Sequence, residues 1–209
     1  MTQIAIAMFP GMTMLDAIGP YQVLTWLPGA EVVLVGAGRG RLTDEKGLLH
    51  VEIEHTYDEV TSPDVIVVPG GVVTRSMAAA GNPLVEWVRS AHPATTWTTS
   101  VCTGALILGA AGVLDGLDAT THWIAYEQLA EFGAHPTEER VVVRGKVITG
   151  AGVSAGIDMA LRLVIELAGV EVAQAIQLGI EYDPQPPVDA GSPSKAPDEI
   201  VELVRAMNA

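Results

Sequence analysis

Hydrophobic residues recur along the chain in two alternating patterns. Short runs of Ala, Val, Ile and Leu that end at glycine or proline predict buried strands, and longer stretches with helical spacing of apolar residues predict helices. The predicted strands cover residues 3–9, 31–35, 48–54, 64–68, 95–100 and 119–121, with a hairpin made of 140–143 and 146–149. The predicted helices cover residues 13–26, 74–80, 82–91, 103–113, 123–132, 155–168, 170–181 and 198–207.

This order of elements predicts an α/β fold. Strands that are apolar along their whole length are buried on both faces, so we expect a flavodoxin-like three-layer sandwich whose mainly parallel sheet has helices on both faces. We expect one domain over residues 1–182. Residues 183–197 contain five prolines, which predicts an extended arm leading to the short amphipathic helix at 198–207. The arm and this helix are expected to pack on the same domain or on a partner subunit.

The charge balance and the cysteine count limit the binding partners and the cellular compartment that we expect. The chain carries 25 acidic and 11 basic residues, a formal net charge of −14, and its basic residues form no stripe, so we expect no nucleic acid partner. No apolar stretch reaches the roughly 18 uncharged residues needed to cross a bilayer, so we expect no membrane partner. The N-terminus lacks the pattern of a secretory signal and a single cysteine forms no internal disulfide, which predicts a cytoplasmic protein.

The sequence predicts neither a bound metal nor a bound cofactor. No His, Cys or carboxylate cluster has the spacing of metal ligands, and no glycine-rich phosphate loop is present.

The single cysteine stands at the most informative position of the sequence. Cys102 separates a β-branched strand from a helix of small residues, in the segment Ser100-Val-Cys-Thr-Gly104. A strained strand-to-helix turn with small neighbours is typical of a nucleophile elbow. Because unpaired amides at a helix N-terminus favour an anion, we expect the pKa of the Cys102 thiol to fall. The alternative is a buried and inert cysteine.

Four other groups are predicted at the same edge of the sheet. Gly70 and Gly71 end a neighbouring strand, and one of their amides is expected to join the Thr103 amide as an oxyanion donor. Asp16 follows the first strand among apolar residues, so burial is expected to raise its pKa and suit it to proton transfer. His122 follows a further strand, where it either pairs with the thiol as a base or is structural.

Five segments carry a family resemblance. They are Leu15-Asp-Ala-Ile-Gly-Pro20, Pro69-Gly-Gly71, Ser100-Val-Cys-Thr-Gly104, Leu114-Asp-Gly116 with Ala119-Thr-Thr-His-Trp123, and Gly150-Ala-Gly-Val-Ser-Ala-Gly-Ile-Asp158. Together they resemble the ThiJ/PfpI superfamily, also called class I glutamine amidotransferase-like proteins, over residues 3–182.

Asp16 narrows the resemblance to two branches. Much of the superfamily has Glu there, whereas Asp resembles isonitrile hydratases and the amidase-like sensor domain of AraC-type regulators. A regulator needs a helix-turn-helix module of about a hundred further residues, whereas this sequence has only one short acidic helix after its proline-rich arm. The expected branch is therefore isonitrile hydratase.

The resemblance implies an activity and a set of site residues. Isonitrile hydratases are lyases that add water to an isonitrile substrate through a cysteine-bound thioimidate, giving an N-substituted formamide. By that resemblance Cys102 is the nucleophile, Asp16 manages protons and Thr103 orients the site. The residues expected to bind the substrate are Gly70, Gly71, Ile18, Val153 and His122.

The superfamily resemblance and the proline-rich arm also imply a homodimer. Two alternatives to the hydratase remain. One is a non-catalytic sensor of small molecules or redox state, and the other is an enzyme acting on reactive carbonyls, which would need Glu and His beside the thiol.

Overall fold

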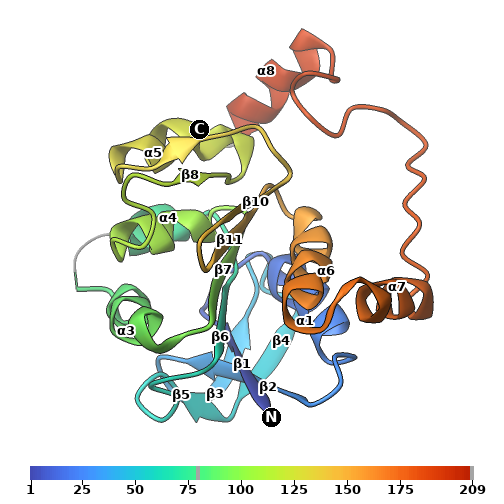
Figure 1. Ribbon diagram of the computed structural model, residues 1–209. Helices are drawn as coiled ribbons and strands as arrows, with labels where there is room; N and C mark the ends of the chain where they lie inside the picture. Colours follow the sequence, from blue (N-terminus) through green and yellow to red (C-terminus); the bar gives the residue numbers. More distant parts are fainter. Residues whose placement is uncertain (79–80, 208–209) are drawn as a thin grey trace.

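A seven-stranded sheet forms the centre of the computed structural model, which describes residues 1–78 and 81–207 (Figure 1). Its strand order is β10-β11-β7-β6-β1-β2-β5, and every neighbouring pair is parallel except β10 and β11. The strands are β1 (Thr2–Ala7), β2 (Ala30–Gly36), β5 (His55–Thr56), β6 (Val65–Val68), β7 (Trp97–Val101), β10 (Val141–Arg144) and β11 (Val147–Gly150). This arrangement confirms the predicted flavodoxin-like α/β fold.

Helices cover both faces of the sheet. On one side lie α1 (Met14–Leu24), α6 (Ala155–Ala168) and α7 (Val170–Gly179), and on the other lie α3 (Pro83–Ala91), α4 (Gly104–Ala110) and α5 (Tyr126–Glu131) (Figure 1). The strand β6 is buried along its whole length, as its unbroken run of valine and isoleucine requires in a sheet covered on both sides.

The short elements differ most from the predictions. The predicted helix at 123–132 divides into a 3₁₀ turn, η2 (Trp123–Ala125), and α5. The predicted helix at 74–80 is observed as α2 (Thr74–Met77), and residues 79–80 lie outside the described residues. The remaining elements are the hairpin β3 (Gly40–Thr43) and β4 (His50–Ile53), the pair β8 (Asp118–Ala119) and β9 (His135–Pro136), and the 3₁₀ turn η1 (His92–Ala94).

The chain leaves α7 as an extended arm and ends in α8 (Asp198–Met207), which lies beyond the upper edge of the sheet (Figure 1). The Tyr182 hydroxyl donates to Asp158 at 2.9 Å where the arm begins. Arg205 of α8 lies over the Trp123 ring, 5.7 Å from its centroid. No helix among the described residues is both long and apolar enough to cross a membrane.

Candidate active site

The end of β7 has the backbone of a nucleophile elbow. Cys102 has φ +56°, a left-handed conformation that is strained for a residue with a side chain. Its amide donates to the carbonyls of Gly150 (3.1 Å) and Ala151 (2.8 Å), and its carbonyl accepts from the Thr121 hydroxyl at 2.8 Å. These bonds hold the turn while α4 begins two residues later, so the thiol, only 5% exposed, is fixed at the carboxyl edge of the sheet.

Asp16 is the charged neighbour of this thiol. It lies in the first turn of α1, has no solvent exposure, and its Oδ2 accepts from the Gly70 amide at 2.9 Å. Its Oδ1 is buried without a hydrogen-bond partner. Burial raises the pKa of Asp16 to about 7, although the Gly70 amide and the Cys102 side chain lower it in part. The expectation of a raised carboxyl pKa is confirmed.

The pKa of Cys102 moves in the opposite direction from the prediction. Burial raises the pKa of the thiol well above its usual range, and the nearby carboxylate of Asp16 raises it further. Backbone amides of Thr103 and Val153 donate toward the sulfur and lower the pKa, but burial outweighs them. The prediction of a lowered pKa from the helix N-terminus is therefore wrong, and the thiol needs a base to become a nucleophile.

The two glycines after β6 have a different role from the one predicted. The Gly70 amide is bound to Asp16, and the Gly71 amide donates to Thr103 Oγ1 at 3.0 Å. Both amides are therefore occupied, and the prediction that one of them is a free oxyanion donor is wrong. A β-carbon at Gly70 would lie 2.6 Å from the Thr103 nitrogen and 2.8 Å from Asp16 Oδ2, so glycine allows these groups to approach each other.

Val153 supplies the amide that the glycines do not. Val153 was expected to line the pocket, and its backbone amide, which donates toward Cys102, was not predicted. The signal was the run of glycines and small residues around it, which lets the backbone pass close to the sulfur. Thr103 also fixes this corner, because its hydroxyl donates to the Gly71 carbonyl at 3.0 Å.

His122 lies near the site and makes no hydrogen bond to the thiol among the described residues. Its Nδ1 accepts from the Ile124 amide at 3.4 Å, and its ring stacks on Trp123 with centroids 5.8 Å apart. Burial, together with the positive charge of Arg75, lowers the pKa of His122 and keeps the ring neutral. Within the described part of the chain, no hydrogen bond joins His122 to Cys102.

Ile18 was also expected to line the pocket, and no metal site was expected. Ile18 lies two residues beyond Asp16 on α1 and is 37% exposed. Across residues 1–78 and 81–207, no group of three or more His, Cys, Asp or Glu side chains is placed to hold a metal ion.

Comparison with known proteins identifies the family. The sequence profile described as the DJ-1/PfpI family matches residues 2–166, most of the chain. The chain belongs to the DJ-1/PfpI family. This confirms the resemblance to the ThiJ/PfpI superfamily on which the site residues were selected.

Several relatives of this DJ-1/PfpI protein are similar over different shares of its length. The isonitrile hydratase of Pseudomonas putida is 44% identical, covering 97% of this chain and 88% of the relative. A ThiJ/PfpI family protein from Pseudomonas syringae has a crystal structure with a TM-score of 0.92 and 38% identity, covering 99% of this chain and 85% of that one. The HTH-type transcriptional regulator CdhR of Pseudomonas aeruginosa is 34% identical, and the matched segment covers 52% of this chain and 32% of the regulator.

Proposed function

We propose that this protein is an isonitrile hydratase, an enzyme that converts an isonitrile and water into an N-substituted formamide. The observation that carries the proposal is the buried pair of Cys102 and Asp16, in which Asp16 Oδ1 has no hydrogen-bond partner and the pKa of the carboxyl is about 7. Such a carboxyl accepts and returns a proton near neutral pH. The 44% identity to the hydratase of Pseudomonas putida over nearly the whole chain supports the same activity.

In the first step, the Cys102 sulfur attacks the terminal carbon of R–N≡C. Asp16 takes the thiol proton as the carbon–sulfur bond forms and delivers it to the same carbon, which gives the thioimidate R–N=CH–S–Cys102. The amides of Thr103 and Val153 stabilise the negative charge that develops on sulfur as it loses its proton. Thr103 holds this corner of the site through its bonds with Gly71.

In the second step, water adds to the thioimidate carbon. One water proton passes to nitrogen, and the carbon–sulfur bond then breaks as the hydroxyl proton returns to the thiol through Asp16. The product is R–NH–CHO, and both Cys102 and Asp16 regain their starting protonation. All atoms balance without an oxidant, a reductant or a cofactor.

The substrate-binding roles of Gly70, Gly71, Ile18, Val153 and His122 belong to this proposal. Gly70 and Gly71 act by holding Asp16 and Thr103, and Val153 acts through its amide. His122 and Ile18 are proposed to contact the organic substituent.

Along with the activity, we propose that the protein is cytoplasmic and forms a homodimer. A single cysteine, which forms no disulfide within the chain, supports a cytoplasmic enzyme. A homodimer is supported by exposed apolar side chains on α1, including Leu15 and Tyr21.

The alternatives have less support. The likeness to the transcriptional regulator covers about half of this chain, whereas the likeness to the hydratase covers 97%. An enzyme for reactive carbonyls was expected to carry Glu and His beside the thiol. The carboxyl next to Cys102 is Asp16, and no hydrogen bond within the described residues joins His122 to the thiol.

One experiment tests the activity directly. The purified protein is incubated with a simple alkyl isonitrile, and formamide is measured by NMR against the Cys102→Ser variant. We expect formamide from the wild type alone, and a transient mass increase equal to one isonitrile on the intact wild-type chain. Formamide at the same rate in both proteins, or in neither, would overturn the proposal.

A further inference from the structure

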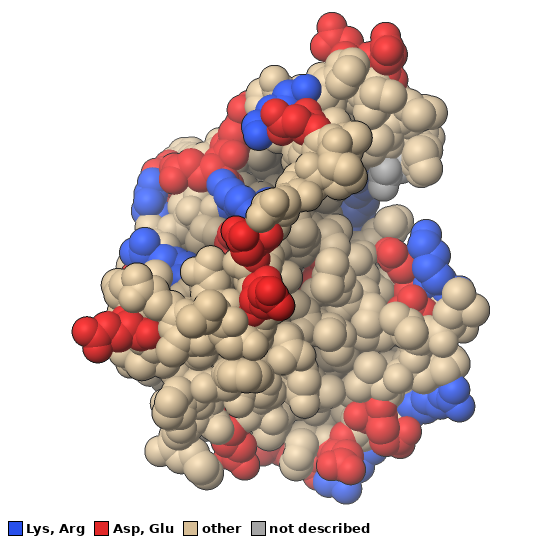
Figure 2. Space-filling view, turned by 90° about the vertical axis from the view of Figure 1, so that its right-hand side faces the viewer, with Lys and Arg blue, Asp and Glu red and all other residues tan. Residues whose placement is uncertain are grey.

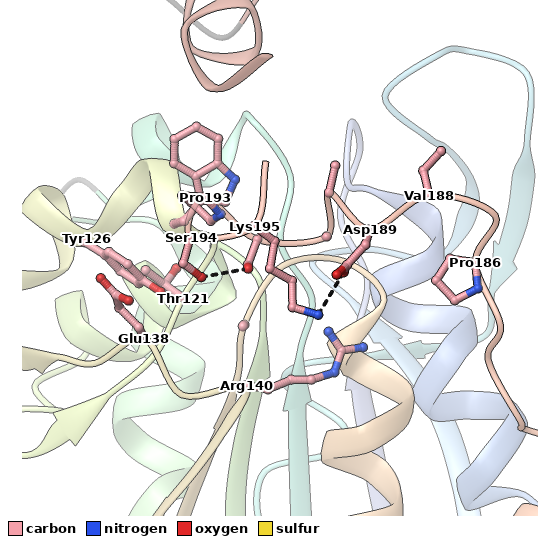
Figure 3. A pocket seen from close by; sticks show the side chains of 15 residues that line it. Thr121, Tyr126, Glu138, Arg140, Pro186, Val188, Asp189, Pro193, Ser194 and Lys195 are labelled. Atoms are coloured by element: carbon pink, nitrogen blue, oxygen red, sulfur yellow. Dashed lines mark hydrogen bonds and ion pairs between the residues drawn. The ribbon is translucent and has the colours of Figure 1, made fainter. Parts of the chain in front are cut away.

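A cavity of about 570 Å³ lies between the C-terminal arm and the core, and two of its lining residues, Thr121 and Ala151, bond to the Cys102 backbone. Figure 3 shows its walls: Thr121 and Tyr126 on one side, Arg140 below, and Val188, Asp189 and Lys195 of the arm on the other. A volume of this size matches the range of small-molecule sites, about 300–1,000 Å³. It is far larger than the two-atom isonitrile group needs.

Two stretches of backbone connect the sulfur of Cys102 to this cavity. Val153, whose amide donates toward the sulfur, is separated by Gly152 from Ala151, which lines the cavity. Along the second stretch, Thr121 donates to the Cys102 carbonyl and also lines the cavity. The sulfur therefore lies near the cavity, with Val153, Gly152 and the Cys102 backbone between them.

The ring of His122 lies between these two stretches. A β-carbon added at Gly152 would approach the His122 ring carbon to 3.0 Å, so glycine gives the ring its place. The ring stacks on Trp123, which lines the cavity. His122 and Trp123 thus form a continuous aromatic wall from the elbow toward the cavity.

The chemistry of the lining favours a neutral aromatic group. Trp123 and Tyr126 are half-buried rings that face the cavity, and aromatic groups bind such rings by offset or edge-to-face stacking. The two cations are already neutralised, since Arg140 pairs with Asp158 at 2.7 Å and Lys195 with Asp189 at 2.8 Å. Glu138 adds a negative charge beside Tyr126, so an anionic substituent would be repelled.

We propose that this cavity binds the organic substituent of the isonitrile and selects substrates in which that substituent is a neutral aromatic group. The inference rests on the proposed hydratase activity. The isonitrile carbon reacts at Cys102, and the substituent extends past His122 to lie between Trp123 and the arm. The cavity then determines which isonitriles are hydrated, while the elbow determines the chemistry.

The arm gives the cavity a cover that can open. No hydrogen bond joins residues 184–197 to residues 1–78 or 81–182. The arm is instead attached at its two ends, by Tyr182 on Asp158 and by Arg205 over Trp123. Between them, Lys195 and Asp189 close a local turn above the cavity. A large substituent can therefore enter without breaking bonds to the core.

The test compares a large substrate with a small one. The ratio of kcat/KM for 2-naphthyl isonitrile to that for methyl isonitrile is measured in the wild type and in four variants. We expect Trp123→Ala to lower this ratio about tenfold, because one stacking wall is lost, and Trp123→Phe to retain most of it. Tyr126→Leu removes a ring without touching the His122–Trp123 stack and should lower the ratio as well. Trp26→Ala, in the turn after α1 and outside the cavity, is the matched control and should leave the ratio unchanged.

A binding measurement separates the two proposals. The Cys102→Ser variant is titrated with N-(2-naphthyl)formamide by calorimetry, alone and combined with Trp123→Ala or with Tyr126→Leu. Weaker binding with Trp123→Ala supports the cavity whatever the turnover shows. If the wild type hydrates both isonitriles and neither the ratio nor the binding responds to Trp123→Ala and Tyr126→Leu, the inference is wrong and the hydratase stands. If the wild type hydrates neither isonitrile and naphthyl binding ignores both rings, both proposals are wrong.

Discussion

Asp16 and Cys102 form a buried pair in which the Asp16 carboxylate disfavours a negative charge on the sulfur, whereas the Cys102 side chain stabilises the carboxylate in part. Burial is the main reason that the pKa of Asp16 rises to about 7, and burial together with the Asp16 carboxylate raises the pKa of Cys102. Near neutral pH the thiol therefore keeps its proton, while the carboxyl is present in both protonated and ionised forms. A thiol that ionises only as it reacts, beside a carboxyl poised to take its proton, fits an addition in which proton and nucleophile move together.

Removing the carboxyl should stop hydration. We expect Asp16→Asn to lower kcat/KM for an isonitrile roughly a hundredfold or more, the usual contribution of a positioned acid or base. His122→Ala should cost less, because its ring makes no hydrogen bond to the thiol. Steady-state formamide production measures both. If His122→Ala abolishes turnover and Asp16→Asn leaves it within a few-fold of wild type, the thiol is activated by histidine instead.

The same carboxyl should make stability depend on pH. In the unfolded chain Asp16 ionises near 3.8, and in the folded chain near 7. Between these values the folded protein keeps a proton that the unfolded chain has released, so Asp16 makes stability fall as pH rises toward about 7. Asn cannot titrate. The free energy of unfolding of Asp16→Asn minus that of wild type should therefore rise from pH 4 to pH 8, by at most about 4 kcal/mol.

Urea unfolding at pH 4, 6 and 8 measures this difference. Asp183→Asn, on the exposed arm, is the matched control and should show a difference that does not change with pH. A flat difference for Asp16→Asn as well would mean that the folded-state pKa of Asp16 is not raised.

The elements meet at the site through unusually close backbone approaches. The turn after β6 passes between α1 and α4, where the Gly70 amide reaches Asp16 and the Gly71 amide reaches Thr103. Gly104, in the first turn of α4, also lacks room for a side chain, because a β-carbon there would lie 2.1 Å from the Val68 carbonyl oxygen. The distances between nucleophile and proton carrier are thus fixed by elements that pack without intervening side chains.

A methyl group at the centre of this packing should disturb the site. Gly70→Ala places a β-carbon 2.6 Å from the Thr103 nitrogen, so backbone must shift. We expect a stability loss of about 1–3 kcal/mol, typical of overpacking, and a fall in hydration of more than tenfold. Gly38→Ala is the matched control, since open space surrounds it and its φ is ordinary. Chemical denaturation and formamide assays test both, and wild-type behaviour of Gly70→Ala would contradict the packing argument.

The sequence predicts elements well where burial alone decides them. The helix at 155–168 is observed with the same ends, and the apolar strands β1 and β6 are in place because their residues are buried on both faces. The strand β3 was missed because the segment around it is rich in glycine and arginine and has no apolar alternation. The raised pKa of Asp16 followed from its apolar neighbours. The partners of Gly70 and Gly71 did not, because an amide's partner depends on how separate elements approach in space.

At the scale of the whole molecule, the face formed by α1, α6 and α7 differs from the rest of the surface. Figure 2 shows a broad area of this face without charged side chains, although the chain as a whole carries 36 charged residues, 25 acidic and 11 basic. Exposed apolar side chains on these helices include Ile18 and Tyr21 of α1 and Leu178 of α7. An uncharged surface with several exposed apolar side chains is typical of a contact between proteins.

We expect two copies of the chain to associate through this face. In a two-fold symmetric dimer the same patch occurs on both sides, so a single new charge is buried twice and opposes its own copy.

Tyr21, which is 38% exposed on α1, is suited to the test, because Tyr21→Glu places that charge on the patch and leaves Asp16 and Cys102 unchanged. Leu203→Glu on α8 is the matched control, since Leu203 is exposed on a helix that packs on its own chain through Arg205 and Trp123. Light scattering at micromolar concentration should give twice the chain mass for wild type and Leu203→Glu and the single mass for Tyr21→Glu. A wild-type monomer would refute the dimer, and dissociation by Leu203→Glu alone would place the contact on the arm.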